Sequence, residues 1–262
     1  MGLAVVALTD HDTTAGLAEA AETASELTEL KFVRGVEISA KAETGTLHIL
    51  GLGIDDGCPE LADALANLRR ARSKRNPKII ARLRDLGIDL AMEDVLEAAG
   101  EAEDGAADRP VSRLHIAEAM RRRGYVSELG EAFAKYIGSG GPAYVDKDTM
   151  APRQAVRAIR ASGGLAALAH PVHLACRNRA QLEHVVRELV SAGIQAIEAY
   201  HSDHTPSQTR LYADLGAKLN LAVVGGSDYH GKGKPDVHLG CPKVALPEVF
   251  GHPLLRRMLD MS

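Results

Sequence analysis

Aromatic side chains are scarce in this sequence of 262 residues: tryptophan is absent, and aromatic residues make up 3% of the total. Apolar residues still account for 45%, which is ample for a hydrophobic core. Aliphatic and alanine side chains must therefore fill the interior. The length allows one large domain or a core domain that carries an inserted module.

Cysteines and targeting segments are equally sparse. Cys58, Cys176 and Cys241 are widely spaced and odd in number, so they predict no disulfide framework and favour a reducing compartment. Residues 1–8 lack a basic n-region, and the longest apolar run is far too short to span a membrane. We therefore expect a cytoplasmic protein without membrane contact, whose oligomeric state the sequence leaves open.

A strong charge excess is missing as well. The formal net charge is −4 and the pI is about 6.3, so the chain has no overall basic character that would indicate nucleic-acid binding. A nucleic-acid substrate would need a local basic patch.

Short apolar runs alternate with helical patterns, and this alternation predicts an α/β fold. The expected strands are residues 3–8, 31–38, 46–54, 164–169, 195–200 and 221–227, and the expected helices are residues 14–30, 152–162, 179–192 and 206–219. The short link between the second and third strands suits an antiparallel hairpin. Strands separated by helices imply βαβ units and a mostly parallel sheet.

Residues 59–148 have a different pattern of apolar and charged residues. Strand signals are missing there, and helical periodicity with many arginines takes their place. The polar segment EAEDGAAD at 101–108 reads as a linker. We predict a helical insert at 59–148, within a domain formed by residues 1–58 and 149–262.

Six apolar runs carry residue types that bind metals at or near their ends. The residues are Asp10 and His11, Glu37, His48, His170, His201 and His204, and Asp228 and His230. Side chains at strand ends converge at the C-terminal face of a β/α barrel. Nitrogen and carboxylate ligands together favour zinc, manganese or iron over calcium or magnesium.

Each of these signals has an ordinary structural explanation when taken alone. Glu37 could face outward from a half-exposed strand, His48 could be a satisfied core histidine, and His173 suits a solvated loop. The GSDYHG motif is the strongest signal, because its glycines allow close backbone approach and Asp228 and His230 can face the same way. Six strand ends with such residues together favour a metal site.

The expected insert carries a second set of candidates. Arg113 and His115 stand just before a helical pattern, and Lys135 and Tyr144 follow in KYIGSGGPAYV. Because arginine can bind phosphate with two parallel hydrogen bonds, we expect Arg113 and His115 to contact substrate. Lys135 and Tyr144 are further substrate-binding candidates, while most of the basic residues at 69–75 suit a solvated helix face.

Several segments together resemble the PHP (polymerase and histidinol phosphatase) family of metal-dependent phosphoesterases: ALTDHDTTAGL, GVEIS, LHILGLGI, SRLHIAEAM, KYIGSGGPAYV, GGLAALAHP and GGSDYHG. The resemblance covers nearly the whole chain. It looks closest to the bacterial group of 3′,5′-nucleotide bisphosphatases and 5′-to-3′ exoribonucleases, which carries a similar helical insert. It implies a distorted (β/α)7 barrel and two or three divalent metal ions, usually manganese, iron or zinc.

The resemblance also implies roles for individual residues. The family's metal ligands match His11, Glu37, His48, His170, Asp228 and His230, with Glu37 as the carboxylate that bridges metals. Arg113 and His115 match the insert's substrate-facing motif. Our candidate catalytic residues are Asp10, which would orient a ligand, and His230 or His204, which would protonate the leaving oxygen.

The sequence departs from the family at its start. Family members open with a strand carrying Asp-Leu-His-x-His, followed shortly by Ser-Asp-Gly, whereas Met1 and Gly2 fall where the next helix-to-strand connection would be. We therefore expect a PHP barrel that lacks its first strand. A truncated gene model is the favoured explanation, because the six later ligands are intact. A trimmed sequence and a degraded relative are the alternatives.

The expected function is hydrolysis of phosphate esters in nucleotides by a metal-activated water. The candidate substrates are 3′,5′-bisphosphate nucleotides and the 5′ ends of short RNA. One alternative is a phosphomonoesterase similar to histidinol phosphatase. Another is a non-catalytic PHP scaffold or binding module.

Overall fold

The computed structural model describes residues 2–100, 111–146, 149–231, 234–244 and 252–260. The chain forms two compact units. The first, the sheet unit, contains residues 1–66 and 149–262, and the second, the helical unit, contains residues 67–148. The polar segment 101–108, which the sequence suggests is a linker, lies outside the described residues.

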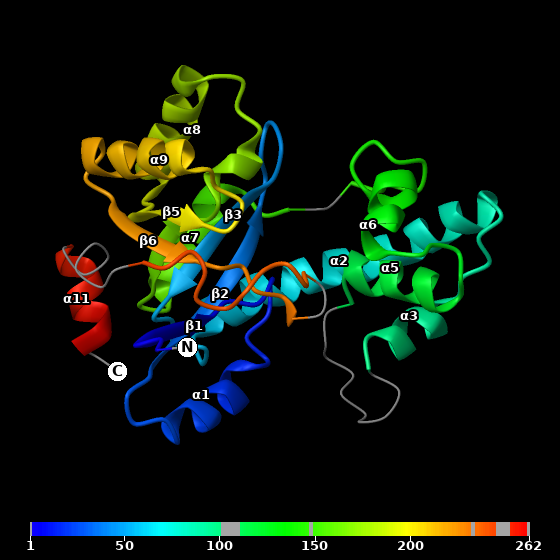
Figure 1. Cartoon of the computed structure of the whole chain (residues 1–262), viewed down its shortest axis with the longest axis horizontal. Coiled ribbons are helices and arrows are strands. Elements are labelled where there is room, and N and C mark those ends of the chain that lie inside the picture. Colours follow the sequence, from blue (N-terminus) through cyan, green and yellow to red (C-terminus); the bar gives the residue numbers. More distant parts are fainter. Residues whose placement is uncertain (1, 101–110, 147–148, 232–233, 245–251, 261–262) are drawn as a thin grey trace. The chain divides into compact units, whose positions relative to one another are not determined.

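Six strands build one mixed sheet in the sheet unit, and they pair in chain order. They are β1 (Val5–Leu8), β2 (Lys31–Ala40), β3 (Leu47–Leu52), β4 (Leu165–Leu168), β5 (Ala196–His201) and β6 (Ala222–Gly226). The β2–β3 and β3–β4 pairs are antiparallel, and the other pairs are parallel. The sheet curls into a half-barrel (Figure 1). The expected strands and the hairpin are confirmed.

Helices accompany this sheet much as the sequence predicts. They are α1 (Leu17–Ser25), α7 (Pro152–Ala161), α8 (Arg179–Ala192), α9 (Pro206–Lys218) and α11 (Pro253–Asp260), with a 3₁₀ turn, η2 (Pro171–Leu174). Helix α7 packs on β2, β3 and β4, whereas α9 packs on β5 and β6 and α1 packs on β2. Figure 1 shows α8 and α9 side by side.

Local hydrogen bonds explain where these helices begin and end. The side chain of Asn178 accepts the Gln181 N–H at 2.9 Å and caps α8, which ends at Gly193 with φ at 106°. Thr205 caps α9 by accepting the Gln208 N–H at 3.3 Å.

The helix expected at residues 14–30 is shorter in the structure, where α1 spans Leu17–Ser25. Before it, the chain is tied to β2: the Asp12 N–H donates to the Glu37 carbonyl at 2.9 Å. After it, Leu27 is 53% exposed, so no apolar burial favours another turn. The Leu30 N–H instead donates to the Leu27 carbonyl at 3.1 Å in the turn that leads into β2.

One face of the sheet is aliphatic at its base and polar toward one end. A buried cluster covers this face: Val33, Leu50, Leu52, Leu165, Ala167, Ala169, Ala196, Ala222, Val224 and Leu255. Side chains alternate between the two faces of a strand, so Glu37 shares the face of Val33. In the β2–β3 register Glu37 lies opposite Leu50, which puts His48 on the same face. The sheet therefore presents a carboxylate and an imidazole beside its aliphatic core.

The helical unit has its own core. Its elements are the greater part of α2 (Pro59–Asp85), then α3 (Met92–Ala98), α5 (Arg113–Arg122), α6 (Leu129–Ala132) and a π-helical turn, η1 (Phe133–Ile137). Aliphatic side chains from these elements are buried together, with Ile79, Leu83, Ile116 and Met120 fully covered. No helix among the described residues is long and apolar enough to cross a membrane.

We predict that Gly35→Ala will destabilise the sheet unit. An added Cβ would lie 2.6 Å from Thr9 Cγ2 and 2.9 Å from the Gly51 carbonyl oxygen, so β2 would have to move away from its neighbours. Overpacking of this kind costs about 1–3 kcal/mol. The measurement is thermal denaturation beside Gly130→Ala, where an added Cβ meets nothing within 4 Å. Equal melting curves for the two variants would contradict this account.

Candidate metal centre

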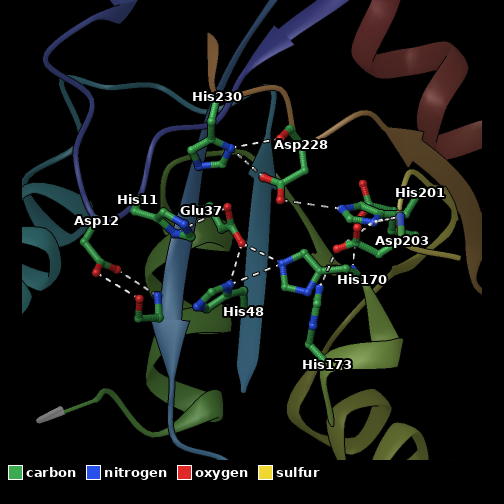
Figure 2. Close-up of polar contacts among 12 residues, drawn as sticks. His11, Asp12, Glu37, His48, His170, His173, His201, Asp203, Asp228 and His230 are labelled. Atoms are coloured by element: carbon green, nitrogen blue, oxygen red, sulfur yellow. Dashed lines mark hydrogen bonds and ion pairs between the residues drawn. The ribbon is translucent and has the colours of Figure 1, made fainter. Parts of the chain in front are cut away.

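A buried carboxylate, Glu37, lies at the centre of a cluster of imidazoles. Its Oε1 atom is 2.6 Å from His48 Nδ1 and 2.9 Å from His170 Nε2, and its Oε2 atom is 3.4 Å from His11 Nδ1. His48 Nδ1 and His170 Nε2 are 3.2 Å apart. Figure 2 shows the three rings converging on Glu37. The structure thus brings together four residues that the sequence singled out.

Backbone pairing explains how these four residues meet. The hairpin of β2 and β3 places His48 opposite Ser39, two residues beyond Glu37. His170 follows β4, whose neighbouring Ala169 N–H donates to the His48 carbonyl at 3.2 Å. His11 forms a parallel bridge with Glu37 beyond the end of β1. Three strand ends that are distant in sequence thus meet at one edge.

Asp12 secures the loop that carries His11. Its buried carboxylate accepts the Ser39 backbone N–H at 2.7 Å and the Ser39 hydroxyl at 3.0 Å. The Glu37 N–H donates to the Asp10 carbonyl at 3.0 Å. These bonds fix the loop against β2 just where its imidazole faces the cluster.

Left-handed backbone conformations gather around the cluster. Asp12, His170 and Asp228 have φ angles of 57°, 23° and 53°, which cost a residue with a Cβ about 1–3 kcal/mol each. The His170 conformation is held by Glu198, whose Oε2 accepts the His170 N–H at 2.7 Å. Strained residues of this kind persist only where the surrounding structure holds them, and they are common at functional sites.

Asp228 marks a second end of the site, after β6. Its Oδ2 atom forms an ion pair with Lys234 and lies 3.8 Å from His201 Nε2. Its Oδ1 atom is 3.4 Å from His230 Nδ1, which also lies 2.9 Å from the Asp228 carbonyl oxygen. The His230 and His11 rings are 6.0 Å apart, so His230 connects this end to the Glu37 cluster.

Of the residues that line this end, the sequence singled out His201 as a metal-binding residue type, but it assigned no role to His173, Asp203 or Glu198. His201 is 2% exposed, and its Nδ1 accepts the Asp203 N–H at 3.0 Å. His173, expected in a solvated loop, is half-exposed; its Nε2 lies 3.0 Å from Asp203 Oδ2, and its ring centroid is 4.7 Å from that of His170. Glu198 had the same signal as Glu37, a carboxylate within an apolar strand, and could have been found by it.

Burial and neighbouring charges separate the pKa values of these groups. Burial alone would raise the pKa of Glu37, but the charges of His11 and His48 and the hydrogen bonds of His48 and His170 hold it well below its usual range. Burial raises the pKa of Glu198 to about 8. Burial also lowers the pKa of His201 to about 4. At neutral pH the site therefore contains an ionised Glu37, a largely protonated Glu198 and a neutral His201.

The other two catalytic candidates, His204 and Asp10, have no side-chain contact with the Glu37 carboxylate among the contacts described above. His204 Nδ1–H donates to the Ala199 carbonyl at 2.9 Å, and its ring packs 4.7 Å from the Tyr212 ring. Its centroid is 5.2 Å from that of His201. Asp10 is exposed and joins the site through its backbone carbonyl. Of the three candidates, His230 has the closest contacts with proposed ligands.

The substrate-binding candidates have structural partners within the helical unit. Arg113 donates to the Ile137 carbonyl at 3.0 Å and lies over the Tyr144 ring at 5.6 Å. His115 Nδ1 accepts the Ser112 N–H at 3.2 Å, which caps α5. Lys135 is 2.7 Å from a Glu131 carboxylate oxygen. Contact of these residues with substrate stays a prediction.

The donor set fits a divalent metal ion. One ligand atom each from His11, Glu37 and His48 lies within 4.8 Å of the other two. Ligand atoms about 2.1 Å from one tetrahedral ion lie roughly 3.4 Å from one another, and the imidazole nitrogens lie 2.6–3.4 Å from the Glu37 oxygens. The buried His170 Nδ1 and His201 Nε2 have no hydrogen-bond partner among the described residues. Nitrogen with carboxylate donors suits zinc, manganese or iron.

Comparison with known proteins gives consistent relatives. No protein-family model matches the chain. A 3′,5′-nucleoside bisphosphate phosphatase from Chromobacterium violaceum is 36% identical over 238 residues, covering 88% of this chain and 78% of the relative. A phosphoribosyl 1,2-cyclic phosphate 1,2-diphosphodiesterase from Eggerthella lenta is 34% identical and covers 91% and 87%. The 5′-3′ exoribonuclease Rnm of Escherichia coli is 33% identical and covers 88% and 76%.

Solved structures agree with these relatives. A Chromobacterium violaceum structure, described as an amidohydrolase with bound sulfate and no metal, has a TM-score of 0.83 and 32% identity and covers 97% of this chain and 85% of that one. A candidate metal-dependent phosphoesterase from Bifidobacterium adolescentis has a TM-score of 0.83 and 29% identity, covering 97% and 86%. The chain therefore belongs to the PHP family of metal-dependent phosphoesterases, hydrolases that act on phosphate esters.

Proposed function

We propose that this enzyme removes phosphate from phosphorylated nucleosides, as 3′,5′-bisphosphate nucleotides or as the 5′ ends of short RNA. The observation that carries the proposal is the buried Glu37 carboxylate with three imidazoles within 3.4 Å of its oxygens. The substrate class is supported by the relatives, which are named as a nucleoside bisphosphate phosphatase, a cyclic phosphoribosyl phosphodiesterase and exoribonucleases. These names have in common a substrate that contains a phosphorylated sugar.

Two or three divalent ions, of manganese, iron or zinc, belong to this proposal. The residues that would hold them are His11, Glu37, His48, His170, Asp228 and His230. Such ions supply Lewis-acid stabilisation of phosphate oxygens and a water of lowered pKa. Glu37 would provide the shared carboxylate, since both of its oxygens already face imidazoles.

Around this chemistry, protein side chains would position groups and move protons. As an alternative to binding metal, His230 is the favoured proton donor to the leaving oxygen, because its side chain is 32% exposed beside Asp228 and can reach a bound substrate. His204 is less favourable, because its Nδ1 is occupied by the Ala199 carbonyl. Asp10 would help to orient the His11 loop through the backbone bond to Glu37.

The proposed domain organisation is a (β/α)7-type PHP barrel formed by residues 1–58 and 149–262, with a helical insert at 59–148. Support comes from the division of the chain at residues 66/67 and 148/149. The insert would contribute specificity through Arg113, His115, Lys135 and Tyr144. The cytoplasmic location expected from the sequence stays a prediction.

A substrate panel separates this proposal from its alternatives. The panel contains a 3′,5′-bisphosphate nucleotide, a 5′-phosphorylated RNA oligonucleotide, histidinol phosphate and a cyclic phosphoribosyl phosphodiester, each assayed with manganese, iron and zinc. We expect the two nucleotide substrates to give the highest kcat/KM. Preference for histidinol phosphate would replace the proposed substrate class. Metal binding without hydrolysis of any substrate would favour a scaffold.

We predict that Glu37→Gln will lose metal and activity together. The amide keeps the shape but removes the charge that holds metal among the imidazoles, so kcat/KM should fall by roughly a hundredfold or more. The measurement is metal content by mass spectrometry together with phosphate release. Glu183→Gln is the matched control, since this carboxylate pairs with Lys218 and Arg187 on the surface. Full metal content in Glu37→Gln would remove Glu37 from the centre.

Arg113→Ala tests the insert. We expect its metal content to stay unchanged while kcat/KM falls far more for a 3′,5′-bisphosphate nucleotide than for an aryl phosphate, because the guanidinium would hold the second phosphate. Loss of the bond to the Ile137 carbonyl should also lower the melting temperature of the helical unit. Arg113→Lys should restore only part of the preference. A changed melting temperature with equal kinetic losses on both substrates would make Arg113 purely structural.

A further inference from the structure

Lys234 contacts the Asp228 carboxylate, and none of the roles assigned so far uses it. Its ammonium forms an ion pair and a hydrogen bond with Asp228 Oδ2. The two side chains are 38% and 18% exposed, respectively. Lys234 comes from the loop after β6, where its backbone N–H donates to the Gly231 carbonyl at 3.3 Å. A positive charge thus lies at the more exposed edge of the site.

The two carboxylate ends of the site differ in their counter-charges. Within the described part of the chain, the ion-pair partners of Glu37 are three imidazoles, which become metal ligands once they lose a proton. Asp228 also lies near two imidazoles, those of His201 and His230, but its Oδ2 atom is paired with an ammonium, which carries three donors and no lone pair. A metal ion can join the Glu37 cluster by displacing protons, whereas a metal ion that binds Asp228 Oδ2 must displace the Lys234 ammonium.

Lys234 also acts on a second carboxylate. Burial alone would raise the pKa of Asp203, but the hydrogen bond with His173 and the charges of His201 and Lys234 hold that pKa below its usual range. Lys234 therefore lies close enough to Asp203 for their charges to interact. An ammonium that left Asp228 would still have a negative partner at the same edge, and it would remain within the site.

We propose that Lys234 is an exchangeable cation of this site: it neutralises Asp228 until a divalent metal ion binds there, and its displaced ammonium then binds a phosphate oxygen of the substrate. The inference rests on the phosphoester hydrolysis proposed above. A divalent ion carries twice the charge of an ammonium, so it competes well for the carboxylate. The flexible stem and compact charge of lysine suit both positions.

Manganese titration of the metal-free protein by calorimetry tests the first half of the inference. We expect the manganese site at Asp228 to form the weaker class of sites, because Lys234 competes for it. Lys234→Met removes this competitor, so the manganese affinity of the weaker class should rise by roughly fivefold or more, the effect of one charge near 4 Å in water. Lys218→Met, which removes a surface lysine paired with Glu183, should leave both classes unchanged. Combining Lys234→Met with Asp228→Asn should abolish the gain. An unchanged weaker class in Lys234→Met, or a gain that persists without the Asp228 carboxylate, would overturn the competition.

Binding of inorganic phosphate to the manganese-loaded protein tests the second half. We expect Lys234→Met to bind phosphate more weakly than wild type, and Lys234→Arg to retain most of the affinity. Equal phosphate affinity in Lys234→Met and wild type would overturn the role toward substrate. Melting temperatures of each variant show whether folding is intact. Failure of the proposed metal centre is a separate result, since it would appear as unchanged manganese binding in Glu37→Gln.

Discussion

The site depends on one constraint, the burial of the Glu37 charge. Glu37 is 4% exposed, and a buried carboxylate is tolerated only when it is paired or bound to metal. Its partners come from the loop after β1, from β3 and from the residue after β4, so satisfying one charge requires three strand ends to meet. Breaking a buried pair by removing one partner costs about 3–5 kcal/mol. The electrostatics of the site and the curvature of the sheet are therefore coupled.

Other parts of the fold hold this arrangement in place. The left-handed residues Asp12 and His170 would relax if they were free, but each is held by a buried carboxylate. Asp12 is fixed through its own side chain to Ser39, and His170 through its backbone N–H to Glu198. Because burial raises the pKa of Glu198 to about 8, its carboxyl adds little negative charge at neutral pH. It holds the His170 backbone through a hydrogen bond and brings little further charge next to Glu37.

Most of the fold and part of the site could be predicted from the sequence, and the physical reasons differ. Strands and helices follow from apolar periodicity, and the convergence of His11, Glu37 and His48 follows from where the strands end. Contacts around Asp228 do not follow from periodicity, because they depend on a left-handed residue and on loop geometry. Lys234 pairs with Asp228 from six positions further along the sequence, beyond the end of β6. The shortened α1 has a similar cause, since tertiary hydrogen bonds of the preceding loop outweigh helix propensity.

The scarcity of aromatic residues has a consequence for the chemistry. The face that carries Glu37 is covered at its base by small and aliphatic side chains, among them Ala167, Ala196 and Ala222. Such a layer is apolar and lets the strands and loops above it approach closely. Charges placed over an apolar layer interact more strongly than charges in water, so the imidazoles of the cluster act on Glu37 with little screening. Asp228 and Lys234, which are more exposed, are screened more. The same sheet thus supports a tightly fixed charge cluster at Glu37 and a looser, exchangeable pair at its edge.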